Sequence, residues 1–157
     1  PFERKMHYSL LIILLTCMYI NMNSKSAGSI MDGNQNNIPM ANSKIKLKFN
    51  SQIFTATLLD NKSVKAFKEM LPLTMKMTEL NGNEKYVDLP HSLPTSSYHP
   101  EMIQIGDLML YGSKTFVLFY KSFSTPYSYT KLGSIDVVKG LASSLGSGNV
   151  TITFELE

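Results

Sequence analysis

Seven aromatic side chains crowd into one stretch of the chain and are the residues best suited to holding a ligand. They are Tyr111, Phe116, Phe119, Tyr120, Phe123, Tyr127 and Tyr129. Tyrosine combines a rigid apolar ring with a hydroxyl group, which suits the capture of a peptide or a small molecule. Most aromatic residues of a small domain pack in its core or at the rim of the core. The sharper prediction is therefore that loop tyrosines such as Tyr127 and Tyr129 line a groove.

Other catalytic chemistry has little support in the sequence. The motif Gly-x-Ser-x-Gly is absent, and the only cysteine, Cys17, lies outside the domain predicted below, which argues against a nucleophilic triad. His91, His99 and Glu101 lie in a proline-rich loop without a known metal-ligand spacing, so we predict no metal site. Asp107 stands just before a predicted strand and is typical of a turn-capping carboxylate. The sequence therefore indicates no cofactor.

The composition favours one domain and argues against nucleic-acid binding. The chain has 157 residues, of which 43% are hydrophobic, enough for one packed core. The net charge of +3 is small, and the lysines alternate with apolar residues instead of forming the basic stripe that nucleic acid requires. The only arginine is Arg4, so the segment after Lys44 has no guanidinium group for a bidentate contact.

Residues 1–20 are predicted to be an export signal. A short basic segment precedes an apolar run from Tyr8 to Ile20, which is short for a membrane span but suits a secretory signal. Two processing routes stay open. Residues 14–17 resemble a bacterial lipobox, in which Cys17 is lipidated, whereas ordinary cleavage falls near residues 24–28. A buried N-terminal helix is the alternative, but polar sequence follows the apolar run directly.

Residues 21–43 are rich in Asn, Ser, Met and Gly and predict a flexible linker, because such a segment cannot bury apolar surface. If Cys17 is lipidated, this linker tethers the domain to a membrane, and the lipid anchor is the only membrane contact that we predict. The expected locations are therefore secreted, periplasmic or membrane-tethered. The sequence does not determine the oligomeric state.

Residues 44–157 predict a mainly β domain. Alternation of apolar and polar residues indicates strands at 44–49, 53–58, 73–78 and 150–156. Further strands are predicted at 85–89, 108–111 and 115–121, and residues 129–135 are predicted to be extended. The strand at 115–121 is apolar on both faces, which is typical of a central strand. Helical spacing predicts an amphipathic helix of about ten residues ended by Pro72, and a short helix from about Val138 to Leu145. Many short strands with two helices favour a closed barrel, and the longer helix could plug one of its ends.

Several segments of this domain resemble a family of bacterial cyclophilin-like domains. The matching segments are FTATLLDN at 54–61, LPL at 71–73, LNGNEKY at 80–86, GDLMLYG at 106–112, LFYKSF at 118–123 and YSYTKLG at 127–133. The resemblance covers nearly all of the domain and implies a closed cyclophilin-like β-barrel with one amphipathic helix and one short helix. It implies little about activity.

True cyclophilins are peptidyl-prolyl isomerases with the same barrel, and the resemblance allows their groove to be placed on this sequence. Their arginine, which polarises the prolyl bond, would fall near Tyr86 and Val87, where this chain has none. Tyr111 falls where the backbone passes the peptide, Phe116 at an apolar pocket position and Tyr129 at a groove histidine. The mechanism of the isomerases is therefore not implied for this chain.

Isomerisation must overcome a barrier of about 20 kcal/mol, which requires a positioned donor beside an apolar proline slot. Phe116, Phe119 and Tyr120 could form the slot, and Lys85 or Lys121 could replace the arginine, although an ammonium group lacks the planar fork. We therefore predict an exported, non-catalytic module that binds a peptide or a small molecule. A divergent prolyl isomerase is the alternative, and an enzyme component acting beside a redox partner has no direct motif. The candidate binding residues are Tyr86, Tyr111, Phe116, Tyr120, Tyr127 and Tyr129.

Overall fold

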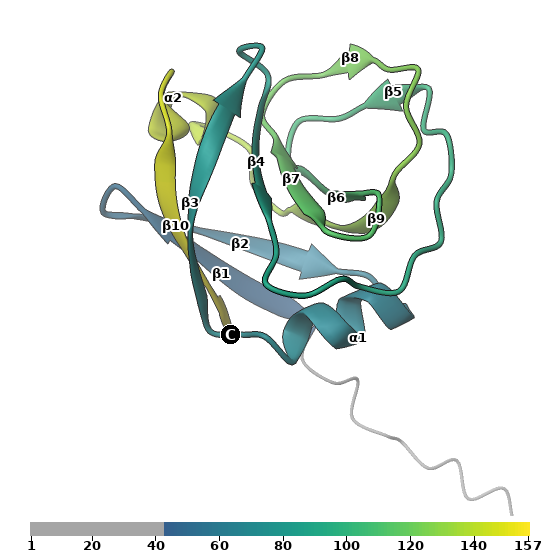
Figure 1. Ribbon diagram of the computed structural model, residues 1–157. Helices are drawn as coiled ribbons and strands as arrows, with labels where there is room; N and C mark the ends of the chain where they lie inside the picture. The colour runs from purple at the N-terminus through teal and green to yellow at the C-terminus, as the bar shows by residue number, and fades with distance from the viewer. Residues whose placement is uncertain (1–42) are drawn as a thin grey trace, which may run out of the picture. The chain divides into compact units, whose positions relative to one another are not determined.

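The structure is a computed structural model that describes residues 43–157. The predicted signal at 1–20, its candidate lipidation site Cys17 and all but the last residue of the predicted linker lie outside the described residues. Ten strands and two helices make up the described part (Figure 1). Within it, no helix is both long enough and apolar enough to span a membrane.

Eight of the ten strands described close into an antiparallel barrel in the order β1-β10-β3-β4-β7-β6-β9-β2, and β5 and β8 pair separately as a short ribbon. The predicted closed, mainly β barrel with two helices is therefore confirmed. The elements are β1 (Lys44–Phe49), β2 (Gln52–Leu58), α1 (Lys62–Lys68), β3 (Leu73–Leu80), β4 (Glu84–Asp88), β5 (Met102–Ile103), β6 (Asp107–Tyr111), β7 (Thr115–Phe119), β8 (Phe123–Ser124), β9 (Thr130–Ile135), α2 (Leu141–Leu145) and β10 (Val150–Leu156).

Two tight turns join β1 to β2 and β3 to β4, and each contains an asparagine with a left-handed backbone. Asn50 and Ser51 have φ angles of 47° and 61° between β1 and β2. Asn81 and Gly82 have φ angles of 55° and 66° between β3 and β4. Asparagine and glycine enter this region more readily than most residues, so the chain reverses at the predicted positions.

Helix α1 begins where the sequence predicts but is shorter than expected. Its first turn is capped by Asn61, whose side chain accepts a hydrogen bond of 2.8 Å from the backbone N–H of Val64. The helix ends at Lys68, because the following residues turn more tightly. The N–H of Met70 bonds the carbonyl of Phe67 three residues back, and the chain then meets Pro72, which disfavours helical backbone just before it.

The apolar face of α1 closes one end of the barrel (Figure 1). Phe67 is fully buried, stacks on Phe116 at 5.3 Å between ring centroids and meets the edge of Phe154 at 6.3 Å. Val64 joins the same buried cluster. The three phenylalanine rings come from α1, β7 and β10, so they tie the helix to two strands that are distant in sequence.

The region of the barrel near α2 contains a buried charge. Lys85 on β4 is fully buried and forms an ion pair with Glu79 on β3. Its ammonium group also donates to the carbonyl oxygens of Gly146 at 2.8 Å and Gly148 at 2.6 Å, on the chain that follows α2. The hydroxyl of Tyr120 donates to the same Glu79 carboxylate at 2.8 Å. This network joins β3, β4 and the residue after β7 to the segment before β10.

Strand β7 is covered on both faces, as its sequence predicts. Its inner face belongs to the main core of the barrel, whereas its outer face belongs to a second buried cluster beside the β5–β8 ribbon. That outer cluster contains Ile103, Met109, Val117, Phe119 and Tyr129. The ribbon therefore lies against the outside of the barrel, and β8 with the loop that follows it forms one wall of the groove described next.

Candidate ligand-binding groove

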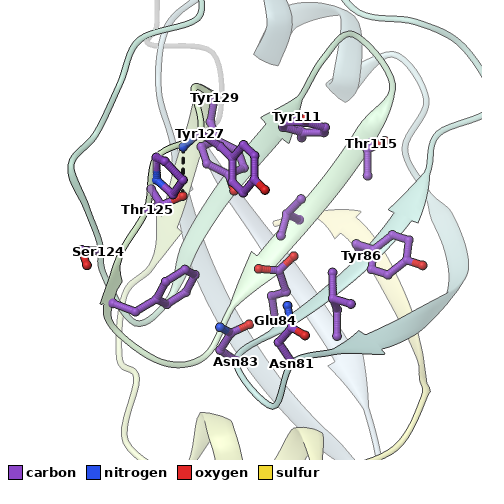
Figure 2. A pocket seen from close by; sticks show the side chains of 14 residues that line it. Asn81, Asn83, Glu84, Tyr86, Tyr111, Thr115, Ser124, Thr125, Tyr127 and Tyr129 are labelled. Atoms are coloured by element: carbon purple, nitrogen blue, oxygen red, sulfur yellow. Dashed lines mark hydrogen bonds between the residues drawn. The ribbon is translucent and has the colours of Figure 1, made fainter.

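A groove of about 480 Å³ lies on the outer face of the barrel, over β4, β6 and β7 and beside the loop that joins β8 to β9. Figure 2 shows the side chains that surround it. Fourteen residues line the groove: Leu80, Asn81, Asn83, Glu84, Tyr86, Tyr111, Thr115, Val117, Phe123, Ser124, Thr125, Pro126, Tyr127 and Tyr129.

Three tyrosines form an aromatic corner on one side of the groove. The ring of Tyr111, at the end of β6, lies 5.9 Å from that of Tyr127 at an angle of 80°, and 5.7 Å from that of Tyr129 at 54°. Tyr111 and Tyr127 are about half exposed, whereas Tyr129 is buried and its ring meets Phe119 edge-on at 5.6 Å. The buried Tyr129 therefore supports the exposed ring of Tyr111, which in turn packs against the exposed ring of Tyr127.

The loop that carries Tyr127 and Tyr129 is held in place by hydrogen bonds. The backbone of Tyr129 exchanges two hydrogen bonds with Tyr98, of 2.9 and 3.0 Å. The backbone N–H of Tyr127 donates to the hydroxyl of Thr125 at 3.2 Å (Figure 2), and Nδ1 of His99 lies 3.2 Å from the carbonyl oxygen of Tyr127. Both tyrosines are therefore positioned before a ligand arrives, which reduces the entropy lost on binding.

Glu84 supplies the groove with a carboxylate that has no partner among the described residues. It begins β4, half-buried between Leu80 of β3 and Phe119 of β7. Within residues 43–157 its side chain makes no hydrogen bond or ion pair. Burial, together with repulsion from Glu79, raises the pKa of Glu84 to about 7. The group therefore changes its charge near neutral pH.

Asn83, which precedes Glu84, provides a second unsatisfied polar group. Its side-chain amide oxygen is buried and has no hydrogen-bond partner among the described residues. Buried acceptors are nearly always paired in folded proteins, so an unpaired one at a groove calls for an explanation. A donor supplied by a bound molecule or by water would provide it.

The lining residues include no lysine, arginine or histidine. Glu84 is the only ionisable carboxylate among them, and the four tyrosines contribute rings and hydroxyl groups. The groove thus combines apolar area with a potential negative charge. No group of three or more metal-ligating side chains is found in the described part of the chain, the residues around His99 included.

The structure brings together four of the six candidate binding residues and separates the other two. Tyr86, Tyr111, Tyr127 and Tyr129 all line the groove. The other two, Phe116 and Tyr120, belong to the interior core of the barrel and line no part of it.

The separation follows from strand geometry, because neighbouring residues of a strand point to opposite faces. On β7, Val117 faces the groove while Phe116 faces Phe67 inside the barrel. On β4, Glu84 and Tyr86 face the groove while Lys85 faces the interior. Lys85, which could have replaced the cyclophilin arginine, is therefore not available in the groove.

Sequence reasoning missed Glu84 and Asn83. A signal was present, because Glu84 and Tyr86 are two residues apart on one strand and must share a face. The Asn81-Gly82 turn also places Asn83 and Glu84 at the start of the strand that carries Tyr86. The signal was weak, because a single glutamate on a strand of alternating polar and apolar residues is typical of a face exposed to solvent.

Comparison with known proteins supports the same fold. The model of the cyclophilin-like family matches residues 47–155. The solution structure of the hypothetical protein AF2241 from Archaeoglobus fulgidus is similar, with a TM-score of 0.50 and 16% sequence identity over 74% of this chain and 95% of that chain. At this identity the likeness concerns the fold alone. A search of curated proteins found no match. Because the family match extends over most of the chain, the chain belongs to the cyclophilin-like family.

Proposed function

We propose that the domain is a non-catalytic binding module that holds a peptide or a small molecule in the tyrosine-lined groove. The observation that carries this proposal is the groove itself. It measures about 480 Å³, is lined by four tyrosines on a closed barrel, and contains polar groups that have no partner within residues 43–157. Ligand sites in proteins are typically mostly apolar cavities of about 300–1,000 Å³ with a few polar groups that fix orientation.

The lining of the groove favours binding over prolyl isomerisation. An isomerase needs a donor that stabilises the twisted prolyl bond, and the strongest donors are cationic. No lining residue is basic, and Lys85 is already engaged by Glu79 and two carbonyl groups inside the barrel. Divergent isomerase activity remains the alternative that the experiment below distinguishes.

We further propose that the protein is exported, on the basis of the apolar run from Tyr8 to Ile20. Mass spectrometry of the membrane and secreted fractions of the producing cell tests the two processing routes. An acylated Cys17 supports the lipoprotein form, whereas a mature chain beginning near residues 24–28 supports simple secretion. If the chain keeps residues 1–20 in both the membrane and the secreted fraction, export with processing is contradicted.

Binding is tested with three tripeptides of the form acetyl-Ala-X-Ala-amide, in which X is Pro, Lys or Glu. Saturation-transfer NMR on the full chain is expected to detect at least one of them. Tyr127→Ala should weaken that binding roughly fivefold to tenfold, because an aromatic contact contributes about 1 kcal/mol. Ile53→Ala is the matched control, since Ile53 on β2 is similarly exposed but does not line the groove.

In a protease-coupled assay of a prolyl tetrapeptide, the full chain is expected to leave the uncatalysed rate unchanged. Turnover above background that is lost in Tyr127→Ala but kept in Ile53→Ala would replace the binding module with the isomerase. Failure of all three tripeptides to bind would contradict a peptide site in the groove.

A further inference from the structure

We infer that the groove recognises an organic cation, a primary ammonium group such as that of a lysine side chain or an alkylamine, held between Glu84 and the tyrosine rings. The inference names the class of ligand for the same groove and therefore rests on the proposed function. It is argued from the arrangement of rings, from the unpaired polar groups and from the response of Glu84 to pH.

The rings and the carboxylate converge on one space. Figure 2 shows the Glu84 side chain reaching into the cavity from β4, with the rings of Tyr127 and Tyr129 on the opposite side. The ring centroid of Tyr111 lies less than 6 Å from the centroid of each of these two rings. Aromatic rings attract cations through their electron-rich faces, and the attraction grows when the site is shielded from water. An ammonium group can therefore meet ring faces and a carboxylate together.

The unpaired groups of Glu84 and Asn83 favour a ligand that donates hydrogen bonds and carries a positive charge. Glu84 has no hydrogen bond or ion pair within residues 43–157, and the buried amide oxygen of the neighbouring Asn83 has no partner there either. Both groups accept hydrogen bonds, and an ammonium group offers three donors and no acceptor. An anionic ligand would be repelled by Glu84 and would find no basic side chain among the lining residues. The groove thus complements a cation in charge and in hydrogen bonding.

Binding of a cation should be linked to the charge of Glu84. Burial and the charge of Glu79 raise the pKa of Glu84 to about 7, so about half of the free protein carries it protonated at neutral pH. A cation favours the ionised form, so binding releases a proton. Affinity should therefore rise as the pH increases through 7, by up to about tenfold between pH 6 and pH 8.

Among the neighbouring groups whose pKa is shifted, Glu84 is the one that titrates over that pH interval. Glu79 on β3 has a pKa below its usual range, because hydrogen bonds from Lys85, Tyr120 and the Gly82 backbone outweigh its burial. The pKa of Tyr120, after β7, is raised to about 12 by burial and by Glu79. Burial also raises the pKa of Tyr129, which precedes β9. These groups therefore keep their charge state from pH 6 to pH 8.

The test compares matched probes with and without the ammonium group. Calorimetry on the full chain uses acetyl-Ala-Lys-Ala-amide against the same peptide with norleucine, and butylamine against 1-butanol. At pH 8 the lysine peptide should bind about tenfold more tightly than the norleucine peptide, and this preference should fall at pH 6. Preference for lysine alone identifies a peptide as the ligand, preference for butylamine alone identifies a free amine, and preference for both supports the shared ammonium chemistry.

Glu84→Gln is the variant that isolates the carboxylate. It should bind the lysine peptide about tenfold more weakly at pH 8 and show no change in affinity between pH 6 and pH 8. Glu69→Gln is the matched control, because it removes the same charge from an exposed position after α1, outside the groove. Thermal unfolding checks the fold. Glu84→Gln should be at least as stable as the parent chain at pH 8, since an ionised Glu84 with a raised pKa destabilises the folded state there.

The failures of the two proposals are distinguishable. If the norleucine and lysine peptides bind equally, or if Glu84→Gln keeps the pH dependence, cation recognition is wrong while binding in the groove stands. If none of these probes and none of the three tripeptides binds, the binding module itself is contradicted.

Discussion

Lys85→Met is expected to lower the free energy of unfolding by about 3–5 kcal/mol, because removing one partner of a buried ion pair leaves the other charge uncompensated. Lys85 is fully buried and is the donor to Glu79 and to the carbonyl oxygens of Gly146 and Gly148. Methionine fills similar space but donates no hydrogen bond, so all three acceptors lose a partner at once. Urea denaturation at pH 7 measures the loss.

Two further variants test the origin of that loss. Lys76→Met removes an exposed lysine from β3 and should change stability by less than about 0.5 kcal/mol. The double variant Lys85→Met/Glu79→Gln should be more stable than Lys85→Met alone, because the uncompensated carboxylate is gone. A loss below about 1 kcal/mol in Lys85→Met would show that the buried network does not stabilise the barrel.

The same network predicts the response of the parent chain to acid. Burial raises the pKa of Glu79, but hydrogen bonds from Lys85 and Tyr120 outweigh this effect and hold the pKa below its usual value. A carboxyl group with a lowered folded-state pKa stabilises the protein above its unfolded-state pKa, and the contribution is lost as the pH falls through the folded-state value. In Lys85→Met this acid-dependent loss should shrink, because the main partner of Glu79 is missing.

Phe67→Ala is expected to lower the free energy of unfolding by about 3–5 kcal/mol, the range for truncating a buried phenylalanine. Phe67 attaches α1 to the barrel through Phe116 and Phe154, and its ring is fully buried between them. Alanine would leave a cavity where three rings meet. Thermal and urea denaturation, followed by circular dichroism, measure the effect.

Phe67→Leu is the control for this prediction, because leucine keeps an apolar side chain of intermediate volume and should lose clearly less stability than alanine. Equal losses in the two variants would contradict the role of the ring contacts. A small loss in both would show that α1 does not plug the barrel.

The sequence predicts the barrel well because its information is local. Alternation along β1, β3 and β10 marks their buried faces, and Asn81-Gly82 marks a turn without reference to the rest of the chain. The helix starts where Asn61 can cap it. Its early end was not predicted, because the tightening of the last turn before Pro72 leaves no clear signal in the spacing of apolar residues.

The candidate site was harder to predict because β7 is apolar on both faces. On such a strand, alternation does not tell which residues point inward, so Phe116 and Tyr120 could not be separated from the outward-facing Val117. The buried role of Lys85 was also hidden. Its carbonyl partners, Gly146 and Gly148, lie more than sixty residues further along the chain and meet it only in the closed barrel.

The groove and the stabilising networks use opposite faces of the same strands. On β4, Lys85 points inward to Glu79, whereas Glu84 and Tyr86 line the groove. The charge of Glu79 nevertheless helps to raise the pKa of Glu84 across β3 and β4. The interior thus fixes the strands that position the groove residues and also adjusts the charge of the carboxylate that we assign to ligand recognition.

Fluorine NMR of the full chain labelled with 3-fluorotyrosine tests this assignment most directly. The chain has eight tyrosines, each assigned by a Tyr→Phe variant, and four of them line the groove. Adding acetyl-Ala-Lys-Ala-amide near pH 7.5 should shift the resonances of Tyr86, Tyr111, Tyr127 and Tyr129 while leaving that of the buried Tyr120 in place. The norleucine peptide should produce smaller shifts at the same concentration. Shifts confined to tyrosines outside the groove, or no shifts with any peptide, would contradict the account.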